Sequence, residues 1–415
     1  MRRKICSIVL ICLFLFTSDS LPQEILSLDS LIKEAKKNNP DIRAAKKRWE
    51  ASLARIPQAK SLEDPKVTLE FEKIPRGSLK IDKTAAEDRM LSVAQAFPFL
   101  GKLPLKGKVA VVESQMFASE YKNKELEIIN EIKSAYFELW LIDKEISLSQ
   151  EMLTLLTGIA KVSESQYIVG NIQQQELFKI NLEIARLNNT IANLIQNKQS
   201  RQVSLNSLLN RPPESPLGAL GVSEAVSFDK DIDSLYKLSL ENQPELLILS
   251  YAIEKNKYAK ALVKKDFIPE LMLQITQRGI VSGSIGPWDL MLAFTVPVWF
   301  WTKQRYAVKE AIDNIEEAKF AYEAMKNKVV ASTKEFAGRI EIAKNQIRLY
   351  KKELIPMMEN SFASSLAAFR SGKGDFMILL DNERMLVETR MDYFKALADY
   401  HGSLAELEQI AGVDF

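Results

Sequence analysis

Most of the chain carries apolar side chains at spacings of three and four residues, the pattern of helices that pack along one face. One set alternates the two spacings and comprises Leu177, Ile180, Ile184, Leu187, Ile191 and Leu194. A second set recurs every seven residues and comprises Leu379, Leu386, Tyr393, Tyr400 and Leu407. Both sets predict long helices that pair as coiled coils. In this pattern Tyr393 and Tyr400 are packing residues rather than substrate contacts.

A long helical segment also precedes each set. The segments run from about Leu103 to Tyr167 and from about Lys303 to Phe369. About 65 residues of helix span roughly 100 Å, far more than a globular core can use. Pro356 interrupts the second segment, and its missing N–H predicts a bend or a locally loosened turn there.

Both helical runs stop at a glycine and then restart. The first stop is Tyr167-Ile-Val-Gly170 and the second is Phe369-Arg-Ser-Gly372. Glycine adopts positive φ without steric cost, so each stop predicts a tight turn that reverses an antiparallel helical hairpin.

Short stretches with a period of two separate the helical runs. In Lys66 to Glu72 the apolar Val67, Leu69 and Phe71 alternate with Thr68, Glu70 and Glu72, and similar alternation occurs at about 90–97, 271–276 and 288–296. Gln95 breaks the apolar face of the second stretch. Trp288 lies at one end of the last stretch and Trp299-Phe300-Trp301 at the other, where interfacial aromatic residues are expected in membrane strands.

Two interpretations of these strands are open: membrane-spanning strands, or soluble hairpins packed on helices. The membrane interpretation predicts an oligomer, because a sheet in hydrocarbon must close on itself and four strands are too few to do so. Several chains would then share one barrel.

The pattern occurs twice along the chain. Asn38-Asn-Pro-Asp-Ile42 matches Asn242-Gln-Pro-Glu-Leu246 at an offset of 204 (242 minus 38), and the two glycine stops are 202 apart (372 minus 170). The predicted organisation is a signal peptide (1–20), a first structural repeat (21–210), a proline-rich connector (211–228) and a second repeat (229–415). A repeat of this length indicates duplication.

Composition narrows the function. Both cysteines lie in the first 20 residues, whose basic start and short apolar run are typical of a secretory signal, and the chain carries a formal net charge of +2. The only histidine, His401, stands outside any metal-binding or catalytic motif, and adjacent Met357 and Met358 are assigned to packing. We predict no enzyme, metal site, cofactor or nucleic-acid partner.

Together, the signal peptide, the duplicated Asn-Pro starts, the strand pairs and the glycine stops resemble the TolC-like outer-membrane efflux proteins, also called outer membrane factors. The resemblance covers nearly the whole mature chain. It implies a mainly α fold in which duplicated helical hairpins form a trimeric α-barrel and four strands per chain form a shared 12-stranded β-barrel. It also implies a passive exit duct in the outer membrane, serving a periplasmic adaptor and an inner-membrane transporter in efflux or type I secretion.

The resemblance further places the hairpin ends at a periplasmic gate. Tyr167, Gly170, Phe369 and Gly372 would form the tip, and Asp381 stands where the family carries a gate aspartate. The family's second gate aspartate is replaced by Ile378, and Asp375 is a candidate substitute. Asp381 and Asp375 are equally interpretable as solvated charges in the first turns of a helix, where acidic residues are favoured. Glu70 and Glu72 are candidate lumen-facing acids, or solvated edge residues.

The alternative from another class is a periplasmic coiled-coil adaptor or scaffold. An adaptor should carry one helical hairpin flanked by compact β-rich domains. This chain has two equivalent hairpins and little sequence left for such domains. The transported substrate is not readable from the sequence.

Overall fold

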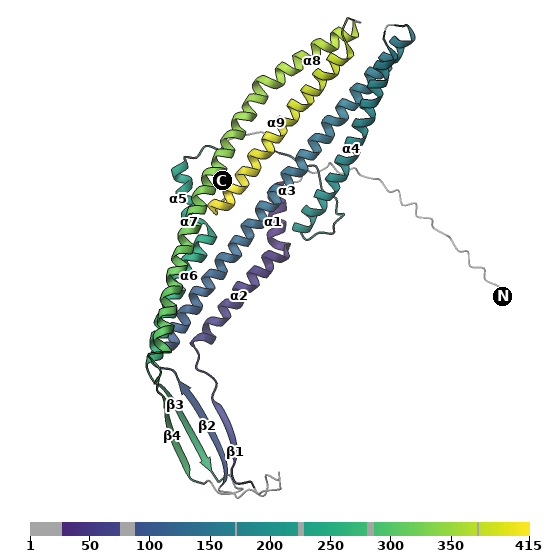
Figure 1. Ribbon diagram of the computed structural model, residues 1–415. Coiled ribbons are helices and arrows are strands. Elements are labelled where there is room, and N and C mark those ends of the chain that lie inside the picture. Colours follow the sequence, from purple (N-terminus) through teal and green to yellow (C-terminus); the bar gives the residue numbers. More distant parts are fainter. Residues whose placement is uncertain (1–26, 75–87, 171, 223–227, 280–285, 372) are drawn as a thin grey trace, which may run out of the picture.

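The computed structural model describes residues 27–74, 88–170, 172–222, 228–279, 286–371 and 373–415. The predicted signal peptide, Gly372 and residues 223–227 of the predicted connector lie outside this set. Figure 1 shows an elongated molecule with the strands at one end and helices extending away from them. Among the described helices, none is both long and apolar enough to cross a membrane.

The four strands form one antiparallel sheet in the order β1-β2-β3-β4. Their bounds are β1 Lys66–Phe71, β2 Arg89–Phe97, β3 Glu270–Arg278 and β4 Trp288–Thr295. The predicted strands are therefore confirmed to within two residues at each end. β2 pairs with β3, which joins the strands of the first repeat to those of the second.

The register gives this sheet one apolar and one polar face. Paired residues share a face, and rows such as Val67–Val93–Ile275–Leu290 are wholly apolar. The opposite face carries rows such as Thr68–Ser92–Thr276–Asp289. The apolar side chains are also exposed: Val67 is 65% exposed and Leu290 67%. Exposed apolar residues concentrated on one face indicate a surface that contacts lipid or another chain.

The long helices form two hairpins whose ends point away from the sheet (Figure 1). The first consists of α3 (Lys102–Ile168) and α4 (Gln174–Leu208), the second of α7 (Gln304–Leu349), α8 (Ile355–Arg370) and α9 (Phe376–Ala411). A π-helical turn, Tyr350–Leu354, separates α7 from α8. Pro356 occupies the first turn of α8, so the loosened turn predicted from this proline is confirmed.

Shorter helices precede the strands in each repeat. They are α1 (Leu28–Asn38) and α2 (Pro40–Lys60) in the first, and α5 (Ile232–Asn242), α6 (Pro244–Lys264) and the 3₁₀ turn Lys265–Phe267 in the second. In each repeat a break separates the first two of these helices. Each break falls before a proline, which favours an extended preceding residue: Asn39 has φ −61° and ψ 127°. Its side chain then caps α2 by accepting the N–H of Asp41 at 2.9 Å.

The core lies between the helices. α3 packs along α2 and α6 near the sheet and along α4 and α9 farther away, so the two repeats share one core. Tyr393 and Tyr400 are buried in it with Trp140 and Leu397, and the Tyr400 hydroxyl accepts the N–H of Phe228 at 3.2 Å. Their predicted packing role agrees with this placement.

One buried lysine joins the helices to the sheet. The ammonium of Lys102, at the start of α3, lies 2.5 Å from an Asp266 carboxylate oxygen and 2.6 Å from one of Glu270. The Lys102 side chain is 8% exposed, whereas both carboxylates are partly exposed. These contacts hold together the start of α3, the 3₁₀ turn after α6 and the start of β3.

We predict that Lys102→Met lowers the free energy of unfolding by roughly 2 kcal/mol, because two carboxylates would lose their shared cation. Thermal unfolding of the detergent-purified protein measures the change. The matched control is Lys264→Met, which removes an exposed lysine from the end of α6. Equal midpoints for the two variants would contradict a structural role for Lys102.

Candidate functional site

The tip of the first hairpin has the predicted glycine turn. Gly170 has φ 80°, and its N–H donates to the carbonyl oxygen of Tyr167 at 2.9 Å. A positive φ is strained for residues with a Cβ, which explains the glycine. Tyr167, Ile168 and Val169 are all exposed, with Ile168 77% exposed. The first tip therefore presents apolar surface that the other described residues leave uncovered.

The second tip is ordered by an aromatic contact and a helix cap. Phe369 is buried, and its ring lies 6.0 Å from that of Phe376 between centroids. Asp375 is the N-cap of α9 and accepts the N–H of Met377 at 2.8 Å. This contact accounts for Asp375 as a capping residue. The roles of Phe369 and Asp375 in a gate stay predictions.

Asp381 lies on a different face of α9 from the core. It shares an exposed stripe with Ile378 (59% exposed) and Met385 (50% exposed), three and four residues away. The opposite face buries Leu379 and Leu386. The described residues thus leave Asp381 exposed. Such exposure is expected of a residue that faces either a central axis or solvent.

Ion pairs tie α9 to the neighbouring helices near the tips. Arg384 lies 2.6 Å from Glu183 of α4, and Arg390 lies 2.7 Å from Glu359 of α8 and 3.7 Å from Glu151 of α3. The two hairpins are therefore linked electrostatically as well as by apolar packing. These ion pairs cannot be predicted from the sequence pattern, because isolated charges on a long helix resemble a solvated face.

Glu383 is a buried carboxyl group between these ion pairs. It is 3% exposed, and its Oε2 has no hydrogen-bond partner among the described residues. Burial, together with the nearby Glu183 carboxylate, raises the pKa of Glu383 to about 7. A cavity of about 250 Å³ beside it is lined by Met152, Phe362 and Leu386, among others.

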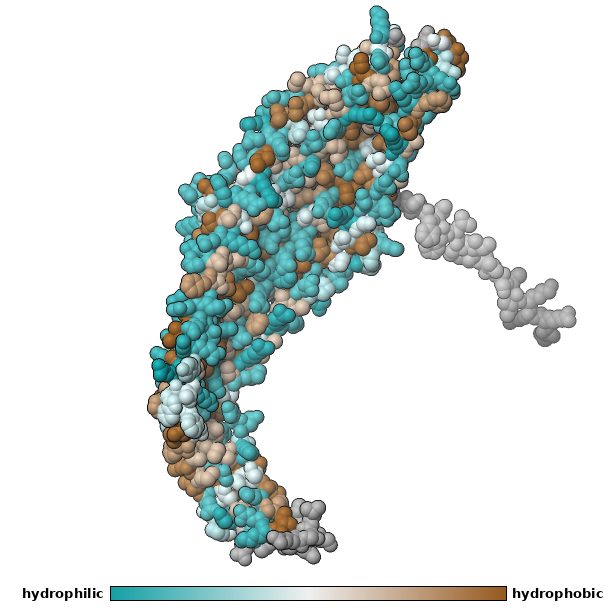
Figure 2. Space-filling view, in the orientation of Figure 1, coloured by the Kyte–Doolittle hydropathy of each residue, from teal (hydrophilic) through white to brown (hydrophobic). Residues whose placement is uncertain are grey.

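The membrane-facing candidates lie at the two ends of the sheet. Trp288 is 61% exposed at the end far from the helices, and Trp299 and Trp301 are 66% and 49% exposed at the helix end. Glu70 pairs with Met90 on the polar face, and exposed Glu72 follows β1. Gln95 interrupts the apolar face, but its side-chain amide donates to the Glu63 carbonyl at 2.9 Å. Figure 2 shows the apolar residues that gather on the sheet.

An exposed apolar sheet face continued by long helical hairpins defines a class of outer-membrane channel. Residues 31–211 and 235–413 match the model of the outer membrane efflux protein family. The chain belongs to this family. It is an outer-membrane efflux channel with a periplasmic helical part, and the adaptor alternative is not favoured.

Three known proteins are similar to this chain in sequence or in fold. The cobalt-zinc-cadmium resistance protein CzcC of Cupriavidus metallidurans is 16% identical over 387 residues, 93% of this chain and 90% of that protein. Vibrio cholerae VceC superposes with a TM-score of 0.78 at 14% identity, covering 94% and 96% of the two chains. Open-state MtrE of Neisseria gonorrhoeae superposes with 0.77 at 15% identity, covering 93% and 89%.

The pKa of Glu383 predicts a pH-dependent stability. Because the native carboxyl binds its proton more tightly than the unfolded one, its contribution is most favourable below pH 4.5 and falls as the pH rises to about 7. We expect Glu383→Gln to stabilise the protein relative to wild type at pH 8, by about 3 kcal/mol per chain, and the gain to shrink toward pH 5.

Thermal unfolding in mild detergent between pH 5 and 8 measures this difference. Glu388→Gln, which changes an exposed acid on the same helix, should follow wild type at every pH. Parallel pH profiles for wild type and Glu383→Gln would show that Glu383 is ionised in the folded protein throughout.

Proposed function

We propose that three copies of this chain form one exit duct. The observation that carries the proposal is the sheet: β1 and β4 each have a strand neighbour on one side only, and one face is apolar and exposed. In hydrocarbon, both edges need partners. Pairing β4 of one copy with β1 of the next gives 12 strands, with apolar residues outside and the polar face, including Glu70 and Glu72, lining the lumen.

The helical part serves as the periplasmic extension of this duct. Its exposed hairpin tips point away from the sheet and are available to a periplasmic adaptor and an inner-membrane transporter. The relative CzcC is a metal resistance protein by name, and related channels share the fold. The chain itself conducts passively, and the inner-membrane transporter selects the substrate and supplies the energy.

Asp381 narrows the closed tip or makes it select cations. Three symmetry-related copies near the axis would concentrate negative charge there, which favours cation binding. The exposed stripe of Ile378, Asp381 and Met385 on α9 is not covered by the described residues of one chain, which supports a position of Asp381 near the axis. Phe369 and Asp375 shape the turn before α9, which carries the stripe, and Tyr167 and Gly170 shape the turn between α3 and α4.

Location and mass together test the duct. We expect the protein in the outer-membrane fraction, and light scattering of the detergent-extracted protein should give three times the mass of the mature chain. The physical reason is that a single four-stranded sheet exposes unpaired edges to lipid. A monomer in the soluble periplasmic fraction would refute the duct.

The gate is tested by Asp381→Ala in planar bilayers. We expect channel block by Mg²⁺ to weaken about tenfold, because each trimer loses three charges, equivalent to about 1.4 kcal/mol. Glu164→Ala removes an exposed acid from α3 and should leave the block unchanged. Unaltered conductance and block in Asp381→Ala would exclude Asp381 from the gate and leave the trimeric duct intact.

A further inference from the structure

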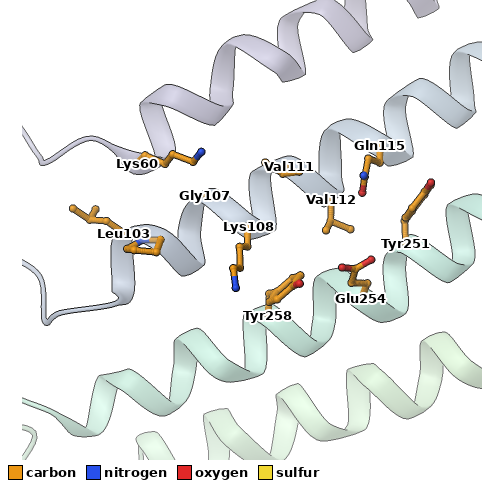
Figure 3. A pocket seen from close by; sticks show the side chains of 11 residues that line it. Lys60, Leu103, Gly107, Lys108, Val111, Val112, Gln115, Tyr251, Glu254 and Tyr258 are labelled. Carbon is orange, nitrogen blue, oxygen red and sulfur yellow. The ribbon is translucent and has the colours of Figure 1, made fainter.

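A cavity lies where the helices approach the sheet. It has a volume of about 530 Å³ and lies between α2, α3 and α6 (Figure 3). Its α3 residues run from Leu103 to Gln115, so it begins six residues after β2 ends at Phe97 and extends about 18 Å along the helix. Near the sheet α2 contacts α3, α3 contacts α6 and α6 contacts α7. The helices α3 and α6 therefore lie in the middle of this row, away from the edges where the next copy of the chain would pack.

The cavity opens on the apolar side of the sheet. Lys102 points to the polar side, because its ammonium binds Glu270, which shares a face with Gln274. At about 100° per residue, Lys108 and Val111 of the cavity lie roughly 180–240° around α3 from Lys102. They therefore face the side on which the sheet contacts lipid.

The cavity mouth carries two cations. Lys60 reaches it from α2 and Lys108 from α3, and neither ammonium is within ion-pair distance of a carboxylate in the residues described. The Lys108 ammonium lies 5.3 Å from the centre of the Tyr258 ring, whose hydroxyl is hydrogen-bonded to Glu254. Figure 3 shows Lys108, Tyr258 and Glu254 between α3 and α6, and Lys60 on the α2 side of α3.

A glycine allows Lys60 to lie over the cavity. A Cβ at Gly107 would lie 2.6 Å from Cγ of Lys60, so a larger residue would displace the lysine. Below the cations, Leu103, Val111 and Val112 provide an apolar wall. The combination of an apolar wall and unpaired ammonium groups suits an amphiphile with an anionic head.

We propose that this cavity binds the phosphate head group of an anionic glycerophospholipid from the periplasm-facing leaflet, with the acyl chains lying along the exposed apolar face of the sheet. Lys60 and Lys108 bind the phosphate, and Tyr258 closes the side toward α6. The occupant is a lipid rather than a free anion because an apolar wall accompanies the two lysines and the cavity begins six residues after β2 ends. This inference rests on the proposed membrane location.

The test is lipid retention by the whole purified oligomer. Native mass spectrometry in mild detergent, after delipidation and titration with phosphatidylglycerol, counts the bound lipids. We expect one lipid per chain for wild type and an affinity at least tenfold weaker for the double variant Lys60→Gln/Lys108→Gln. The matched control, Lys46→Gln/Lys122→Gln, makes the same charge change at exposed lysines of α2 and α3 and should retain the lipid.

Three results would overturn the assignment. They are equal retention by wild type and the cavity variant, equal losses in the cavity and control variants, and equal affinity of wild type for phosphatidylethanolamine and phosphatidylglycerol. The measured mass shows at once whether each variant still assembles. An outer-membrane trimer without bound lipid refutes this inference alone, whereas a soluble monomer refutes the proposed function with it.

Discussion

The need to pair every backbone amide in hydrocarbon governs this structure. The described residues of one chain provide four strands, and within them the sheet keeps two open edges, β1 and β4. The proposed closure by identical copies would satisfy those edges and would also fix where the helices stand, because α3 follows β2 and α7 follows β4. The Lys102 contacts with Asp266 and Glu270 make that junction stiff, so the direction of the strands is transmitted to the helices.

The strand and helix patterns were readable from the sequence because each repeats over many residues. Alternation from Val67 to Phe71 and the heptads from Leu379 to Leu407 predict burial and direction without tertiary information. The helix breaks at Asn39 and Gln243 were harder to predict from the sequence. Each break depends on whether the extended backbone favoured before a proline outweighs the packing of a continuous helix. The hydrophobic pattern continues across both breaks and therefore does not reveal them.

The charged residues near the tips were harder to predict from the sequence. The seam of α9 continues from Leu379 through Glu383, Leu386 and Arg390 to Tyr393, at spacings of four and three. Glu383 and Arg390 therefore occupy seam positions at which apolar residues are expected. The series that recurs every seven residues from Leu379 does not include them. Which acid pairs with Arg390 depends on the approach of α3 and α8, and no local pattern specifies it.

Buried polar groups of this kind destabilise a helical seam relative to apolar residues of similar volume, but they can select one arrangement of the helices. Glu383 lies between hairpins that Arg384 and Arg390 hold together, so proton uptake and the ion pairs act on the same interface. An interface of aliphatic residues alone would tolerate sliding and rotation of α9. With the charges in place, moving the Asp381 stripe requires the ion pairs to break together, so the tip favours discrete positions over continuous ones.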